Sequence, residues 1–248
     1  MSDLSGKRVL VTGGGTGIGA SIVEVFAEAG AGVGLHHWRS EAGARALAER
    51  LWARGVEIHL FRADLLDPIA RDGLVPEFLA RFGGIDVLVN NAGAPLALAH
   101  YLELGPESWR REFALNVDAP FFLAQAAMRS MRENGGGRIV NISSIGVKYA
   151  GSAQTLAYSA AKAALEAVTR ALAKLGAEHN ILVNAIRPGV VGATLQRMMP
   201  SEEFNRRVGL IPLKRAGDPR EVAEMVRYLA SDAAAFITGQ IIAVAGGD

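Results

Sequence analysis

Hydrophobic residues along this chain follow two alternating spacings, one typical of buried strands and the other typical of helices. A short apolar run within Lys7–Thr12 predicts a strand, and apolar residues then recur with helical spacing from Ile18 to Ala29. The same alternation continues through the chain. It predicts further strands at Ala31–His37, Val56–Phe61, Ile85–Val89, Gly137–Ile142 and Ile181–Ile186, and further helices at Glu41–Arg54, Asp67–Phe82, Pro106–Glu133 and Thr155–Leu175.

Strands that are separated by helices imply right-handed crossover connections and a parallel sheet covered on both faces. Near-continuous apolar strands such as Asp86–Val89 fit burial on both sides. Pro120 lies inside the predicted Pro106–Glu133 helix and should kink or divide it. Because no linker, repeat or low-complexity tract interrupts the pattern, the sequence predicts one α/β domain over residues 1–248, with a doubly wound parallel sheet.

Composition narrows the function classes. The 248 residues suffice for one sizeable core, and the formal net charge of +1, with acids and bases interspersed, gives no electrostatic footprint for nucleic acid. The lack of cysteine excludes disulfides and thiol nucleophiles. The longest apolar stretch, Ile85–Leu104, is broken by polar residues, and the first predicted strand begins at Lys7. We therefore expect a soluble, cytoplasmic protein without a membrane span.

Tyr158 and Lys162 form the most suggestive pair in the chain, because residues four apart lie on the same face of a helix. Free tyrosine ionises near pH ~10. A cation about 5 Å away, at an effective dielectric of about 20, favours the phenolate by about 3 kcal/mol, or about 2 pKa units. The pair therefore predicts a phenol that can pass a proton near neutral pH. Taken alone, the same spacing also fits a packed ring beside a solvated charge.

A glycine-rich turn, Gly13 to Gly19, lies between the first predicted strand and the first helix. There a phosphate can approach the backbone and the helix N-terminus. The glycines follow the pattern Gly13-x-x-x-Gly17-x-Gly19, with a longer first turn than the usual Gly-x-Gly-x-x-Gly. The alternative is a flexible turn, which the position between strand and helix disfavours.

Polar residues also follow the later strands, where ligands bind in sheets of this kind. They are Asp64, Asn90-Asn91-Ala92-Gly93, Ser143-Ser144 and Pro188-Gly189. Together with Asn116, the glycine turn, Tyr158-x-x-x-Lys162 and the Ile237–Gly247 ending, these residues resemble the motifs of the short-chain dehydrogenase/reductase family along essentially the whole chain.

The resemblance implies a Rossmann-type sheet of about seven strands that binds a nicotinamide dinucleotide and transfers a hydride between a carbonyl and an alcohol. It also implies a homo-oligomer, often a tetramer, with contacts near Glu133, Leu175 and Ile241. Two departures stand out. The gap from Ser144 to Tyr158 is longer than usual by about one residue, and Thr194 stands one position beyond the usual threonine.

The resemblance also implies roles for four catalytic residues. Tyr158 would be the general acid in reduction and the base in oxidation. Lys162 would lower its pKa and hold the nicotinamide ribose, Ser144 would donate a hydrogen bond to the carbonyl oxygen, and Asn116 would anchor a water that relays protons to Lys162. The alternatives are a strand-end hydroxyl for Ser144 and a locally bonded helical amide for Asn116.

The end of the second strand bears on the choice of cofactor. An acidic residue that binds the ribose hydroxyls would favour NAD, but His37 stands at or near this position and Arg39 and Ser40 follow. Since a guanidinium can bind phosphate, we expect NADP(H) to be favoured over NAD(H), the alternative being that both are accepted. The residues expected to contact the cofactor are Gly13, Gly15, Thr16, Gly17, Ile18, Gly19, His37, Trp38, Arg39, Asp64, Leu65, Asn91, Ala92, Gly93, Tyr158, Lys162, Pro188, Gly189 and Val191.

Successive strand residues point to opposite faces, so His36 and His37 should not share a metal ion, and no metal site is expected. The small-molecule substrate should contact Pro95–Tyr101, Ile145–Leu156 and Thr194–Leu213. For Thr194–Leu213, the alternative is an amphipathic helix that closes on the core. A 3-oxoacyl thioester, a sugar or polyol, and a cyclic ketone all remain open. The rival functions are a non-catalytic dinucleotide-binding regulator and a methyltransferase on a similar sheet.

Overall fold

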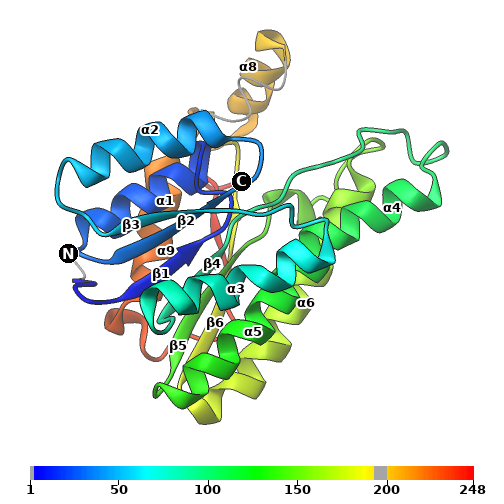
Figure 1. Cartoon of the computed structure of the whole chain (residues 1–248). Coiled ribbons are helices and arrows are strands. Elements are labelled where there is room, and N and C mark those ends of the chain that lie inside the picture. Colours follow the sequence, from blue (N-terminus) through cyan, green and yellow to red (C-terminus); the bar gives the residue numbers. More distant parts are fainter. Residues whose placement is uncertain (1–2, 193–199) are drawn as a thin grey trace.

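A computed structural model describes residues 3–192 and 200–248 and shows a seven-stranded parallel sheet in the order β3-β2-β1-β4-β5-β6-β7 (Figure 1). The predicted α/β class with a doubly wound sheet is therefore confirmed. The strands are β1 (Arg8–Val11), β2 (Gly32–His37), β3 (Ile58–Arg62), β4 (Val87–Asn90), β5 (Gly137–Ile142), β6 (Ile181–Pro188) and β7 (Ile241–Val244).

Helices cover both faces of the sheet and bury a hydrophobic cluster against each (Figure 1). One cluster joins α1 (Gly17–Glu28), α2 (Glu41–Trp52) and α9 (Pro219–Ala230) to the sheet. The other joins α3 (Pro68–Phe82), α5 (Ala119–Glu133) and α6 (Leu156–Gly176). The strands between the two layers are buried on both sides, which explains their uninterrupted apolar sequences.

The predicted helix Pro106–Glu133 is divided. It consists of α4 (Pro106–Phe113), a π-helical segment at Ala114–Asp118, and α5. Pro120 has no N–H to donate to the carbonyl of residue 116, and its ring disfavours regular helix before it. The irregular segment therefore holds Asn116, one of the predicted catalytic residues, in the kind of helical bulge that often occurs at functional sites.

Two further helices lie near the C-terminus; α9 was not predicted, whereas α8 (Ser201–Leu210) lies in the Thr194–Leu213 segment, for which an amphipathic helix was one alternative. In α9 the Asp218 side chain accepts a hydrogen bond from the Arg220 N–H at 2.7 Å, and the Glu221 side chain accepts one from the Asp218 N–H at 2.8 Å. This capping box defines the start of the helix. The other helix, α8, projects from the body of the protein (Figure 1). The predicted substrate-contacting residues 194–199, with Thr194, lie outside the described residues.

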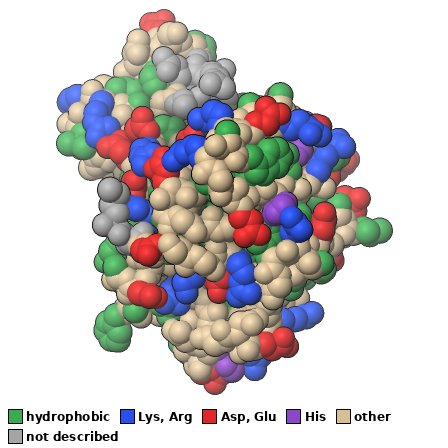
Figure 2. Space-filling view, turned by 60° about the vertical axis from the view of Figure 1, so that its left-hand side comes forward, with side chains coloured by type: hydrophobic (Ala, Val, Ile, Leu, Met, Phe, Trp, Pro, Cys, Tyr) green, Lys and Arg blue, Asp and Glu red, His purple; other side chains and the backbone are tan. Residues whose placement is uncertain are grey.

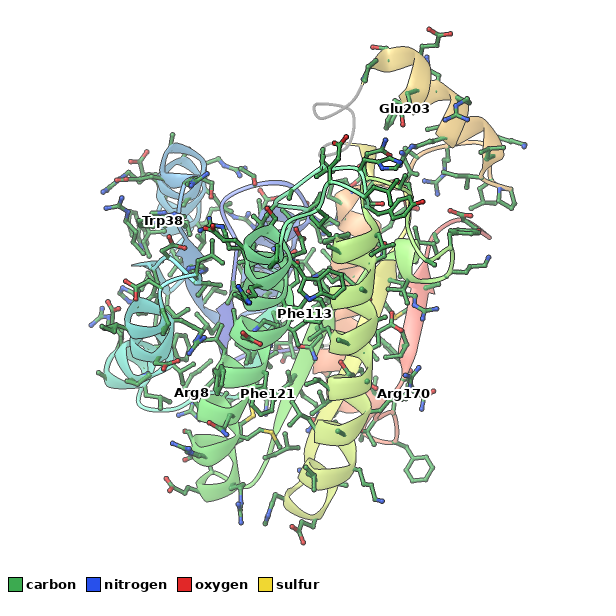
Figure 3. All side chains as sticks on the ribbon, turned by 90° about the vertical axis from the view of Figure 1, so that its right-hand side faces the viewer. Arg8, Trp38, Phe113, Phe121, Arg170 and Glu203 are labelled. Atoms are coloured by element: carbon green, nitrogen blue, oxygen red, sulfur yellow. The ribbon has the colours of Figure 1, made fainter. Side chains whose placement is uncertain are left out.

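Figure 3 shows the two ends of the molecule. Arg8, at the start of β1, lies at one end, whereas Trp38, directly after β2, and Glu203 on α8 lie toward the other. The carboxyl ends of all seven parallel strands face the latter end, and β1 and β4 are neighbours at the point where the strand order reverses. A ligand site is expected there.

Charged side chains of both signs are interspersed over the face drawn in Figure 2. Within residues 3–192 and 200–248, every helix is too short or too polar to cross a membrane.

Candidate active site

A cleft of about 1410 Å³ opens at the carboxyl ends of the strands and brings together most of the predicted site residues. Those that line it are Gly13, Thr16, Ile18, Gly19, Trp38, Arg39, Asp64, Leu65, Asn91, Ala92, Gly93, Ser144, Tyr158, Lys162, Pro188, Gly189 and Val191. The structure leaves Gly15, Gly17, His37 and Asn116 out of the lining. Parts of all three predicted substrate segments, including Leu96, Tyr149 and Arg206, also line the cleft.

The glycine turn is packed so closely that one position admits no side chain. A Cβ on Gly19 would lie 2.1 Å from the Gly13 carbonyl oxygen and 2.5 Å from Asn91 Nδ2. The first turn of α1 is thereby held against both the glycine turn and the loop after β4. This arrangement presents backbone N–H groups and a helix N-terminus to the cleft, which suits a pyrophosphate. Gly15 instead packs against Ser40.

Thr12, whose role was not predicted, connects the ends of β1 and β4. Its buried Oγ accepts hydrogen bonds from the N–H groups of Asn91 and Ala92, both at 3.0 Å. Asn91 Nδ2 donates in turn to the carbonyls of Thr12 and Gly13 at 2.9 and 3.1 Å. These bonds fix the relative position of the glycine turn and the Asn91–Gly93 loop.

The two histidines of β2 have separate surroundings. His36 Nδ1 accepts from the Gly13 N–H at 3.1 Å, while Nε2 bonds to the Ala63 carbonyl at 3.0 Å, so both ring nitrogens bind backbone groups. Burial lowers the pKa of His36 to about 4. The prediction placed His37 beside the cofactor, but this residue is buried and His36 lines the cleft instead, because alternate strand residues face opposite ways.

The part of the cleft that follows β2 carries exposed cations. Arg39 and Ser40 line the cleft directly after β2. Arg62, which was not predicted, lies over the Trp38 ring with its guanidinium carbon 4.9 Å from the ring centroid. Carboxylates are not among the residues that directly follow β2, in contrast to the usual NAD-binding arrangement.

Ser144, Tyr158 and Lys162 meet in another part of the cleft. Ser144 follows β5 and accepts a hydrogen bond from the Gly146 N–H at 3.1 Å. Tyr158 and Lys162 lie on α6, and the ammonium nitrogen is 5.7 Å from the phenol ring centroid, which confirms their predicted proximity. Ser143 also lines the cleft, but its hydroxyl is already used, because it donates to Glu166 at 2.7 Å. This hydrogen bond favours Ser144 over Ser143 as the hydroxyl that is free to bind a substrate.

The prediction that the pKa of Tyr158 is lowered is wrong: in this structure the pKa is raised. Burial raises the pKa of Tyr158 to about 12, against the opposing effect of a hydrogen bond with Ser144. Burial also lowers the pKa of Lys162 to about 8, against the opposing charge of Glu112. The enclosed ammonium group donates a hydrogen bond to the Ile142 carbonyl at 2.8 Å. Desolvation is thus the largest influence on the pKa of each group.

Gly93 leaves space beside Lys162 and Asn116. A Cβ on residue 93 would lie 2.8 Å from Lys162 Nζ and 2.7 Å from Asn116 Oδ1. The Asn116 oxygen is buried and has no hydrogen-bond partner among the described residues. A buried acceptor of this kind requires a donor such as a water or ligand hydroxyl. The residues present therefore fit a nicotinamide ribose and an ordered water beside Lys162.

Glu112 is a functional candidate that was missed. This carboxylate is fully buried in α4, four residues before Asn116, and it accepts a hydrogen bond from Asn116 Nδ2 at 3.0 Å. Its spacing from Asn116 was visible in the sequence, but a charged residue in a helix more often faces solvent. Only the packing of α4 against α6 shows that this one is enclosed (Figure 3).

Comparisons with known proteins agree with this geometry. A family model described as Enoyl-(Acyl carrier protein) reductase matches residues 13–248. The 3-oxoacyl-[acyl-carrier-protein] reductase of Vibrio cholerae is 35% identical over 245 residues, which are 99% of this chain and 98% of that protein.

This chain belongs to the short-chain dehydrogenase/reductase family. Two solved structures of similar proteins cover 99% of it, each with a TM-score of 0.92. One is a blue fluorescent protein from a metagenomic library in complex with NADPH. It is 37% identical in sequence to this chain, and the match covers 98% of its length. The other is a 7α-hydroxysteroid dehydrogenase complexed with NADH and 7-oxo glycochenodeoxycholic acid, 30% identical and covered to 95%.

The predicted resemblance is confirmed, and with it the prediction of an NAD(P)-dependent oxidoreductase that acts on a carbonyl/alcohol pair. The glycine turn and the Tyr158–Lys162 pair of this short-chain dehydrogenase/reductase line one cleft.

Proposed function

We propose that this short-chain dehydrogenase/reductase is an NADPH-dependent carbonyl reductase in which Tyr158 donates the proton. The observation that carries the proposal is the meeting of Ser144, Tyr158 and Lys162 in one cleft with the glycine turn. With its pKa at about 12, Tyr158 is protonated at neutral pH. This is the form that a proton donor requires in the direction of reduction.

The reaction divides among four side chains. The nicotinamide, when bound, supplies the hydride. Ser144 donates a hydrogen bond to the substrate oxygen and fixes its position, and Tyr158 gives that oxygen its proton as negative charge develops. Lys162 holds the nicotinamide ribose and stabilises the phenolate that remains, while Asn116 anchors the water that returns a proton through Lys162.

The preference for NADPH rests on Arg39 and Ser40. Both line the cleft directly after β2, where a guanidinium and a hydroxyl suit the adenosine 2′-phosphate. Arg62, stacked on Trp38, adds a second cation at this end of the cleft.

The substrate end of the cleft combines apolar and cationic groups. Leu96, Ile145 and Leu210 line it together with Arg111 and Arg206. We infer a hydrophobic carbonyl substrate that bears an anionic group, such as a carboxylated 3-oxoacyl compound. A pair of ketones that differ only by a carboxylate tests this, because the arginines should lower KM for the anionic member.

The homotetramer also remains a proposal. It is supported by large hydrophobic side chains that are exposed in the single chain, among them Leu175 at the end of α6 and Phe236 before β7. Light scattering coupled to size exclusion measures the assembly directly. The cytoplasmic location remains a prediction.

The proposed function is tested by following NADPH and NADH oxidation over a panel of 3-oxoacyl thioesters, cyclic ketones and sugars. We expect carbonyl reduction with kcat/KM at least about tenfold higher for NADPH than for NADH. A comparable preference for NADH would contradict the cofactor assignment. NADPH binding without turnover of any carbonyl would favour the non-catalytic regulator, and saturable binding of S-adenosylmethionine without NADPH binding would favour a methyltransferase.

A further inference from the structure

Glu112 makes three kinds of contact that the catalytic roles above do not explain. Its Oε1 accepts from Asn116 Nδ2 at 3.0 Å, and its Oε2 accepts from the Leu96 N–H at 2.9 Å. The carboxylate also interacts through its charge with Lys162 and Tyr158 on α6. One buried side chain thus contacts the substrate-side loop and Asn116, and its charge reaches the proton-transfer pair.

The Asn116 amide shows what the first contact does. Its nitrogen faces the Glu112 carboxylate and the carbonyls of Glu112 and Ala94, at 3.0, 3.0 and 3.2 Å. Because three acceptors surround the nitrogen, the amide oxygen must face the other way. That oxygen is the buried, unpartnered atom beside the Lys162 ammonium, and the charged carboxylate is the strongest of the three acceptors.

The second contact restrains the loop that leads to the substrate. Leu96 lies in the loop between β4 and α4 and lines the cleft. A carboxylate can accept from the Leu96 N–H and from Asn116 at the same time, one bond on each oxygen. A neutral amide offers a single acceptor oxygen, so Gln at this position must give up one of the two bonds.

We propose that Glu112 is a positioning residue of this active site, which orients the Asn116 amide toward Lys162, restrains the Leu96 loop and supplies a fixed negative charge beside the Tyr158–Lys162 pair. This inference rests on the proposed function. The charge of Glu112 raises the pKa of both Tyr158 and Lys162 on α6. Burial raises the pKa of Glu112 itself, and the hydrogen bonds from the Leu96 N–H and Asn116 and the charge of Lys162 oppose that rise.

Glu112→Gln is the test, with Glu107→Gln as the matched control, since Glu107 lies on the same helix and is exposed. The parent protein is first assayed for carbonyl reduction by NADPH, and failure there would count against the proposed function and not against Glu112 alone. In an active protein, Glu112→Gln should lower kcat about threefold to tenfold. Loss of the charge should move the midpoint of the kcat/KM pH profile for alcohol oxidation to lower pH by about half a unit to one unit.

Glu112→Asp separates the effect of the negative charge from the effect of the side-chain length. It keeps the negative charge while shortening the side chain, so kcat should fall and the pH midpoint should stay near that of the parent. An unchanged pH midpoint in Glu112→Gln, or equal effects in Glu107→Gln, would overturn the proposal. If circular dichroism shows that both Glu112 variants are unfolded, Glu112 serves the fold and the proposal is equally overturned.

Discussion

The two ends of the cleft contain different kinds of chemical groups. The proposed dinucleotide end combines a glycine turn and a buried neutral ring, His36, which is bound to the Gly13 N–H and the Ala63 carbonyl, with an exposed cation, Arg39. The catalytic end uses charged side chains that the protein encloses, Glu112 and Lys162 among them. An exposed guanidinium can bind a phosphate from solvent, whereas enclosed charges change one another's proton affinities.

Glu166 shows that burial alone does not define the catalytic end. This carboxylate lies on the same helix as Lys162 and is equally buried, but it forms a bidentate ion pair with Arg187, with Nε at 2.6 Å and Nη2 at 2.5 Å. Ser143 donates a further hydrogen bond to it. Glu166 therefore connects β5, β6 and α6 as a satisfied ion pair, whereas the Asn116–Lys162 region retains an unpartnered oxygen among the described residues.

The largest expected effect is at the catalytic end. Tyr158→Phe removes the proton that reduction requires and keeps the ring, so kcat should fall by at least about a hundredfold. Tyr228→Phe, on the remote helix α9, is the control and should retain full turnover. Near-normal turnover of Tyr158→Phe would remove this residue from the mechanism.

A smaller effect is expected at the dinucleotide end. Arg39→Ala removes the cation that lines the cleft after β2 and should reduce the preference for NADPH over NADH about tenfold, with little change in kcat at saturating cofactor. The exposed Arg54, beyond the end of α2, provides the matched control, Arg54→Ala. Selectivity measured as the ratio of the two kcat/KM values should be unchanged in the control, and an unchanged ratio in Arg39→Ala would refute the assignment.

The smallest effect concerns stability. Because folding lowers the pKa of His36 from the ordinary 6.5 to about 4, the neutral ring stabilises the fold fully above pH 6.5, and this contribution is lost as pH falls toward 4. Between pH 7.5 and 5.5 the loss of this contribution should reduce the free energy of unfolding by about 1 kcal/mol. Denaturant titrations of the parent and of His36→Asn measure it. If the free energy of unfolding depends equally on pH in both proteins, His36 is not the cause of this pH dependence.

The sequence predicted the fold well because its apolar strands and helical spacings are strong local signals. It also predicted Ser144, Tyr158 and Lys162 as neighbours, since motifs that follow parallel strands meet at one edge of a sheet. Pro120 correctly predicted an interruption of the Pro106–Glu133 helix, but the sequence did not predict that the interruption is a π-helical segment at Ala114–Asp118, which depends on how α4 packs.

Burial explains the remaining misses. The expected pKa of Tyr158 considered the charge of Lys162 and not the desolvation of either group, and desolvation is set by tertiary packing. The prediction placed His37 at the cleft, whereas His36 lines it, because a shift of one residue along a strand moves the side chain to the opposite face of the sheet. Glu112 escaped notice because its Leu96 partner lies sixteen positions away in a loop without a regular pattern.

The division of labour between the two ends is tested most directly by the dissociation constant of NADPH for Tyr158→Phe, measured by fluorescence titration on the protein whose turnover has been lost. The account predicts a value within about threefold of the parent, because Phe keeps the ring of Tyr158 and leaves the glycine turn, Arg39 and Lys162 in place. A dissociation constant weakened in proportion to the loss of turnover would contradict it.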